Sequence, residues 1–150
     1  MSKPKRYLTV DRTVRLESRD KADALKELIE VVGTAPEVSD TEAFGRAIFD
    51  RESIMSTGIG IEIAVPHAKL GSVSHFVMAV GVAPDGIPWD SIDGKPVKIV
   101  VMIAGPDDRQ EDYLRILSRV VLLLRSPKNR ERLLAAESAE EIATFFHRVG

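Results

Sequence analysis

The sequence contains no cysteine, which excludes disulfide bonds, thiol chemistry and the usual structural zinc sites. It also lacks an apolar run of the roughly 18 residues that a membrane-spanning helix needs, and its charged first residues lack the apolar segment of a secretory signal. We therefore expect a cytoplasmic protein without direct membrane insertion. The net charge is only −2 and no long lysine and arginine stripe occurs, which argues against nucleic acid as a partner.

What is present is ordinary for a globular protein. The 150 residues are 44% hydrophobic and 29% charged, enough for one proper core. We expect a single domain over residues 1–150, preceded by a flexible basic tail over about residues 1–6.

Strand and helix patterns interleave along the chain. Apolar runs predict strands at 14–16, 76–82 and 97–104, with a Pro/Gly-rich loop at 84–96 that Trp89 anchors. Apolar periodicity and capping signals predict a helix from Asp20 to Gly33 and another at 114–124. Between them, a capping box at 39–42 predicts the start of a helix that runs to Arg51. Two more begin at Ser126-Pro127 and Ser138. The fold class is thus α/β, with a central mixed sheet and helices packed on its faces.

The most informative stretch is STGIGIEIAVPHAK, residues 56–69. A Gly-containing loop leads into the strand-like run 63–65, and Pro66 ends the strand because it has no N–H to donate. His67 would then stand at a rigid strand end. Imidazole gains and loses a charged group near neutral pH, so a histidine held this way suits reversible nucleophilic chemistry at phosphorus. The alternative is a surface or hydrogen-bonded core histidine with no chemical role.

The other histidines indicate no second site. His75 begins a strand, and His147 is a cation near a helix C-terminus. The three histidines lack metal-ligand spacing, so we expect no metal site. Gly58 and Gly60 lack the third glycine of a dinucleotide fingerprint and the Lys-Ser/Thr of a P-loop.

The whole stretch resembles the active-site signature of the enzyme IIA domains of the phosphoenolpyruvate-dependent sugar phosphotransferase system, of the fructose/mannitol class that includes the nitrogen-regulatory paralogue. The resemblance runs roughly from Val14 to the end of the chain. Its matching segments are Arg51-Glu52, Ile59-Gly60, 63–68, 87–90, 93–97 and 133–138.

The resemblance implies the fructose/mannitol-type fold and a role in phosphoryl transfer. A histidine-containing phosphocarrier protein would donate the phosphoryl group to His67, through a neutral ring nitrogen. Arg51 would bind phosphoryl oxygens, although a cation at a helix C-terminus is also favoured by the helix dipole alone. The neutral donors would come from Ser56, Thr57, Gly58 and Gly60. No cofactor is implied, and the protein would be a phosphotransferase component that is not self-sufficient.

Two positions depart from the family pattern. Tyr113 stands where many members carry a second histidine before leucine; its hydroxyl can donate one hydrogen bond, but the ring cannot become cationic. Glu62 stands where many members carry a small residue, and a carboxylate near a phosphohistidine would be unfavourable.

Three functions are compatible with this sequence. The first is a nitrogen-type regulatory enzyme IIA whose phosphorylation state controls a target protein. The second is a sugar-transport enzyme IIA that donates to a fructose- or mannitol-like enzyme IIB. The third, which Tyr113 and Glu62 motivate, is an interaction module that works without phosphorylation.

Overall fold

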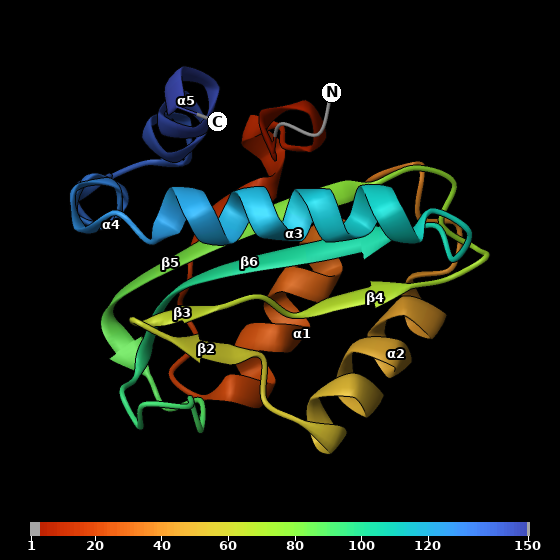
Figure 1. The fold of residues 1–150 in the computed structure, drawn as a ribbon, viewed down its shortest axis with the longest axis horizontal. Helices are drawn as coiled ribbons and strands as arrows, with labels where there is room; N and C mark the ends of the chain where they lie inside the picture. The colour runs from red at the N-terminus through yellow and green to blue at the C-terminus, as the bar shows by residue number, and fades with distance from the viewer. Residues whose placement is uncertain (1–3, 150) are drawn as a thin grey trace.

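The computed structural model describes residues 4–149, which form a six-stranded mixed sheet between layers of helices (Figure 1). The strands run in the order β1-β5-β6-β3-β2, and β4 also pairs with β6. The strands are β1 (Thr13–Arg15), β2 (Gly58–Gly60), β3 (Ile63–Ala64), β4 (His67–Lys69), β5 (Val77–Ile87) and β6 (Val97–Gly105). The helices are α1 (Lys21–Val32), α2 (Thr41–Ile54), α3 (Gln110–Leu124), α4 (Pro127–Ala135) and α5 (Ala139–Val149), with short 3₁₀ turns at Pro4–Tyr7 and Val10–Arg12.

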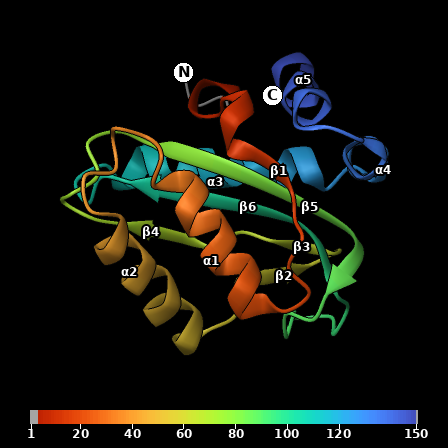
Figure 2. The ribbon, with the colours of Figure 1, turned by 180° about the vertical axis from the view of Figure 1, so that it is seen from behind.

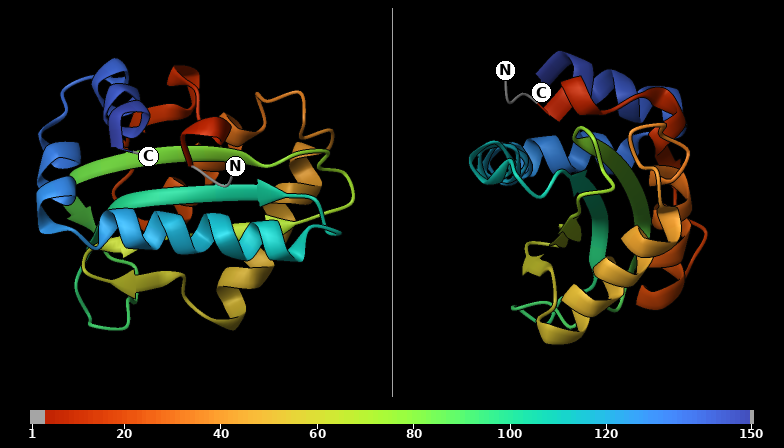
Figure 3. Two further views of the ribbon diagram at one scale, coloured as in Figure 1. Left: turned by 45° about the horizontal axis from the view of Figure 1, so that its top comes forward. Right: turned by 90° about the vertical axis from the view of Figure 1, so that its right-hand side faces the viewer.

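Both faces of the sheet are buried. Figures 2 and 3 show α1 and α2 across one face and α3 along the other. Side chains of β6 alternate between the two resulting cores: Val100 and Met102 pack with α1 and α2, whereas Val101 and Ile103 pack with α3 and α5. Burial on both faces explains why β5 and β6 read as continuous apolar runs in the sequence.

The local helix signals were largely right. Asp20 caps α1, Ser126 caps α4 with Pro127 in its first turn, and the Ser138 hydroxyl caps α5. The second helix is corrected at its start, because Asp40 rather than Ser39 is its N-cap; the Ser39 hydroxyl donates instead to the carbonyl of Ser72.

Several further boundaries differ from the sequence prediction, three of them by three residues or more. α2 continues past Arg51 to Ile54, α3 begins at Gln110, and β5 extends into the predicted loop as far as Ile87. Of the predicted basic tail, residues 4–7 form a 3₁₀ turn, and residues 1–3 lie outside the described residues.

The region around Pro66 also differs from the prediction. His67 does not end a strand but begins β4, and Pro66 lies between β3 and β4, which both run parallel to β6. The carbonyl of Pro66 accepts a hydrogen bond from the N–H of Ile103, so the path stays tied to β6 although proline has no donor. The Gly-containing segment 58–60 is not a loop either: it forms β2, antiparallel to β3.

Glu62 lies far from His67. Its carbonyl accepts from the N–H groups of Lys98 and Ile99, and its carboxylate pairs with the Lys98 ammonium at 3.1 Å. His67 pairs with Ile103, five residues beyond Lys98 along β6, or roughly 16 Å at ~3.3 Å per residue. Glu62 has a φ of 69° in the β2–β3 turn, a conformation that favours glycine, which accounts for a small residue in the family pattern.

Candidate functional site

His67 is held by its own backbone neighbourhood. Its Nδ1 lies 2.7 Å from the carbonyl oxygen of Val65. A carbonyl oxygen can only accept, so Nδ1 must carry the proton and donate it. The tautomer is therefore fixed, and the lone pair lies on Nε2, the nitrogen that is left to act as a nucleophile.

The surroundings keep the imidazole of His67 uncharged. Burial of the half-buried ring lowers its pKa from the ordinary value of 6.5, and the bond to the Val65 carbonyl opposes this effect in part. The Arg51 and Lys69 cations lower the pKa further, while Glu52 raises it. A neutral imidazole with a free Nε2 is the nucleophilic form at neutral pH.

Arg51 brings a positive charge to this site. It lies in the last turn of α2, which packs beside β4, and its side chain is partly buried. Among the side chains that the structure describes, none forms a hydrogen bond or an ion pair with its guanidinium. Its charge nevertheless lowers the pKa of both His67 and Tyr113. A guanidinium that has no such partner among the described side chains can bind an anion at His67.

Tyr113 lies directly against His67. It sits in the first turn of α3, and the centroids of the two rings are 5.2 Å apart at an interplanar angle of 48°. The tyrosine is 4% exposed, and its buried hydroxyl has no hydrogen-bond partner among the described residues. Burial raises the pKa of Tyr113, so the hydroxyl keeps its proton and remains an unused donor.

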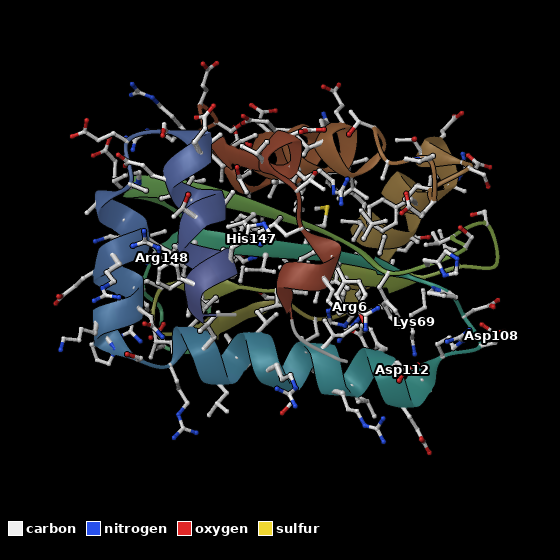
Figure 4. All side chains as sticks on the ribbon, turned by 90° about the horizontal axis from the view of Figure 1, so that it is seen from above. Arg6, Lys69, Asp108, Asp112, His147 and Arg148 are labelled. Atoms are coloured by element: carbon white, nitrogen blue, oxygen red, sulfur yellow. The ribbon has the colours of Figure 1, made fainter. Side chains whose placement is uncertain are left out.

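Lys69 is a site residue that sequence reasoning missed. It follows His67 by two residues on β4, so both side chains leave the same face of the strand. Its Nζ lies 4.8 Å from the centroid of the Tyr113 ring and donates a hydrogen bond to Oε1 of Gln110. Figure 4 shows Lys69 beside the first turn of α3. The signal was strand alternation, which cannot be applied when His67 is read as the end of a strand.

The hydrogen-bond donors predicted to bind phosphoryl oxygens instead bond within residues 52–58 and to Trp89. The Thr57 N–H lies 3.0 Å from a Glu52 carboxylate oxygen, and the Thr57 hydroxyl donates to the same carboxylate. The Ser56 hydroxyl donates to the carbonyl of Trp89 at 2.9 Å and accepts from the N–H of Gly58 at 3.1 Å. Gly60, with a φ of 91°, enters the β2–β3 turn. In this arrangement both hydroxyls and the N–H groups of Thr57 and Gly58 are engaged within this part of the chain.

A buried ion pair anchors the end of α2. The Glu52 carboxylate, 5% exposed, lies 2.6 Å from the Lys21 ammonium at the start of α1. Lys21 also lies over the ring of Trp89, 5.6 Å from its centroid. The pair fixes the helix turn that carries Arg51, and no sequence pattern pointed to Lys21.

No second buried or half-buried histidine occurs among the described residues. His75 and His147 are exposed, and Figure 4 shows His147 on α5, away from Lys69. No group of three or more His, Cys, Asp or Glu side chains within residues 4–149 could hold a metal ion. No helix in that same range has the length and apolar character needed to cross a membrane.

Known proteins are similar to this chain in sequence and in fold. A fructose-specific EIIABC component of Bacillus subtilis is 40% identical over 129 residues; the match covers 86% of this chain and 20% of that protein, so the chain spans about a fifth of its length. A fructose-specific EIIA component of Haloferax volcanii is 37% identical over 122 residues, covering 81% of this chain and 79% of the relative. The nitrogen regulatory protein IIA-Ntr of Neisseria meningitidis superposes with a TM-score of 0.87 at 25% identity, covering 95% of this chain and 97% of that structure, which confirms the predicted fold.

A family model described as "Phosphoenolpyruvate-dependent sugar phosphotransferase system, EIIA 2" matches residues 7–149. The resemblance seen around His67 therefore extends over nearly the whole chain, through both helical layers and the sheet. The protein belongs to this EIIA family of the phosphotransferase system.

Proposed function

We propose that His67 accepts a phosphoryl group from a histidine-containing phosphocarrier protein and passes it on. One observation carries the proposal: His67 has a free Nε2, its ring packs against Tyr113 with its unused hydroxyl, and its pKa is lowered by a guanidinium that has no carboxylate partner among the described residues. This set provides a nucleophile, a cation for phosphoryl oxygens and a neutral donor. Phosphoryl transfer needs little more, because catalysis consists mainly of positioning and charge stabilisation.

The transfer step follows from the fixed tautomer. The Nε2 lone pair attacks the phosphorus of the donor phosphohistidine, and the donor's P–N bond breaks with its electron pair returning to the donor ring. Nδ1 keeps its proton and goes on donating it to the Val65 carbonyl, so the phosphorylated ring carries a positive charge next to the phosphoryl dianion. Arg51 and the Tyr113 hydroxyl stabilise the oxygens during the exchange. Release to an acceptor reverses these changes.

Two acceptors remain under this proposal. An enzyme IIB is supported by the fructose-specific relatives, one of which by its name joins A, B and C components. A regulatory target is supported by the fold match to the nitrogen regulatory protein. In the second case the chain would act as a nitrogen-type regulatory enzyme IIA.

Purified protein incubated with phosphoenolpyruvate, enzyme I and the phosphocarrier tests the proposal. We expect one phosphoryl group per chain, labile in acid and stable in base, as for a phosphohistidine. Adding a fructose-type enzyme IIB then separates the two acceptors: rapid discharge supports transport, and a phosphoprotein that persists supports regulation. Absence of any acid-labile phosphate on the wild-type chain would refute the phosphocarrier function.

The lowered pKa of His67 predicts a particular pH dependence. Because the folded-state pKa lies below the unfolded value of about 6.5, the unfolded chain binds the proton more readily in the window between them. The contribution of His67 to the free energy of unfolding is thus complete above about pH 6.5 and declines as the pH falls through that window. We also expect the transfer rate to stay level from pH 8 to about 6.5. A proton NMR titration with His67 assigned by substitution measures this pKa, and a value above 6.5 would contradict the prediction.

Tyr113→Phe is expected to slow phosphoryl transfer by about tenfold, the cost of one lost hydrogen bond to a charged group. Stability should change little or increase slightly, because the buried hydroxyl has no partner to lose in the unphosphorylated protein. Rapid-quench transfer assays and thermal melts measure the two effects. Unchanged transfer kinetics in the phenylalanine variant would show that Tyr113 serves only to pack the apolar face of α3 into the core.

A further inference from the structure

The ammonium of Lys69 is held beside the phosphoryl position, and no acidic side chain of residues 4–149 pairs with it. Its contacts are neutral ones, the Gln110 side-chain oxygen and the Tyr113 ring. Within the described residues it makes no ion pair, and the nearby Asp112 instead pairs with Arg109 and Arg115. A lysine held by neutral partners keeps its full charge available for an incoming anion.

Strand geometry places this charge within reach of a phosphoryl group on His67. Alternate residues of a strand lie roughly 6.6 Å apart on one face, a distance that the four-carbon stem of lysine can span. The Tyr113 ring packs against both side chains, at 5.2 Å from the His67 ring and 4.8 Å from Lys69 Nζ. His67 and Lys69 therefore share one neighbour and one side of the sheet.

We propose that Lys69 leaves Gln110 when His67 is phosphorylated and binds the phosphoryl oxygens directly. The inference rests on the proposed phosphorylation of His67 and goes beyond it, because it assigns a second cation to the site. Tyr113 can donate a hydrogen bond but cannot become cationic, so without Lys69 the only cationic partner for the dianion among the named side chains of this site would be Arg51. Gln110 acts as the resting partner that holds the ammonium close before the phosphoryl group arrives.

A different role for Lys69 would be to attract an acidic partner surface during docking. The two roles separate in the isolated phosphoprotein, where no partner is bound. A cation in contact with the phosphoryl oxygens stabilises the dianion and lowers the pKa of the phosphoryl group. A lysine that acts only in docking leaves that pKa unchanged.

The experiment is a ³¹P NMR titration of the phosphorylated full chain after removal of enzyme I and carrier. We expect Lys69→Met to raise the pKa of the phosphoryl group by about 1, and Lys69→Arg to restore the wild-type value. Lys98→Met is the matched control: it removes the same charge from the Glu62 pair, far from His67. Thermal melts establish that each variant is folded.

Transfer kinetics give a second readout. At saturating carrier, Lys69→Met should lower the transfer rate by about 10-fold or more, while Lys98→Met stays at the wild-type rate. If the phosphoryl pKa is the same in the Lys69→Met, Lys98→Met and wild-type proteins, the proposed role of Lys69 is wrong, while the phosphocarrier function stands. A wild-type chain that shows no phosphohistidine signal would instead refute the function on which this inference rests.

Discussion

Replacing His67 with alanine is expected to abolish phosphate incorporation from phosphoenolpyruvate. The substitution removes the ring nitrogen that would attack phosphorus, and the described site holds no second nucleophile of this kind, because Tyr113 keeps its proton. Labelling by enzyme I and carrier, followed by acid and base treatment, measures the loss. The fold should persist, since the ring is only half-buried at the start of an edge strand.

His75 and His147 provide matched controls for this experiment. Both are exposed histidines, so His75→Ala and His147→Ala remove an imidazole without disturbing the core. Each variant should be labelled like the wild-type protein. Full labelling of His67→Ala, or loss of labelling in either control, would place the phosphoryl group elsewhere.

Arg51→Ala is expected to slow transfer by about 100-fold or more while the protein stays folded. A donor aimed at charge that develops in the transition state is worth about two to three orders of magnitude in rate. The stability effect is small, because a cation near a helix C-terminus contributes only about 0.3–1 kcal/mol, and Arg51 has no ion-pair partner to lose within residues 4–149. Single-turnover transfer from the phosphorylated carrier and thermal melts measure the two quantities.

Arg46 on the same helix is the control for charge alone. It is exposed and pairs with Glu42 at 3.5 Å, so Arg46→Ala changes the net charge equally but leaves the site intact. Arg51→Lys should recover only part of the rate, since lysine keeps the charge but not the fork of donors. A marked drop in melting temperature with normal transfer in Arg51→Ala would assign Arg51 a structural role.

The parts of the fold that sequence patterns predicted are those that depend on local interactions. Asp20, Ser126 and Ser138 cap their helices through bonds to residues three positions away, so the signal lies within one turn. The runs of β5 and β6 are long enough to indicate buried strands. β2, β3 and β4 have only two or three residues each and form because β3 and β4 pair with β6 and β2 pairs with β3. The β6 partners lie 36 residues away in the sequence, as for His67 and Ile103.

The residues of the site also fall into those that the sequence indicated and those that only tertiary contacts reveal. His67, Arg51 and Tyr113 were named from the family resemblance; in the structure the rings of His67 and Tyr113 pack together, and the charge of Arg51 lowers the pKa of both. Lys69 and Lys21 were missed because their roles depend on tertiary contacts. The path of β4 after Pro66 orients Lys69, and the packing of the start of α1 near the end of α2 brings Lys21 to Glu52. Ser56 and Thr57 were correctly placed in the loop, but their hydrogen bonds to Trp89 and Glu52 depend on packing that no spacing reveals.

The position of Trp89 gives this chain an optical reporter of its own. It is the only tryptophan, 1% exposed, and its carbonyl receives the Ser56 hydroxyl while its ring lies beneath the Lys21 ammonium. Its fluorescence therefore arises from one environment, a dry one next to the ion pair that anchors the helix of Arg51. A spectral change on adding a phosphorylated carrier would register movement of that anchor in real time, without any attached dye.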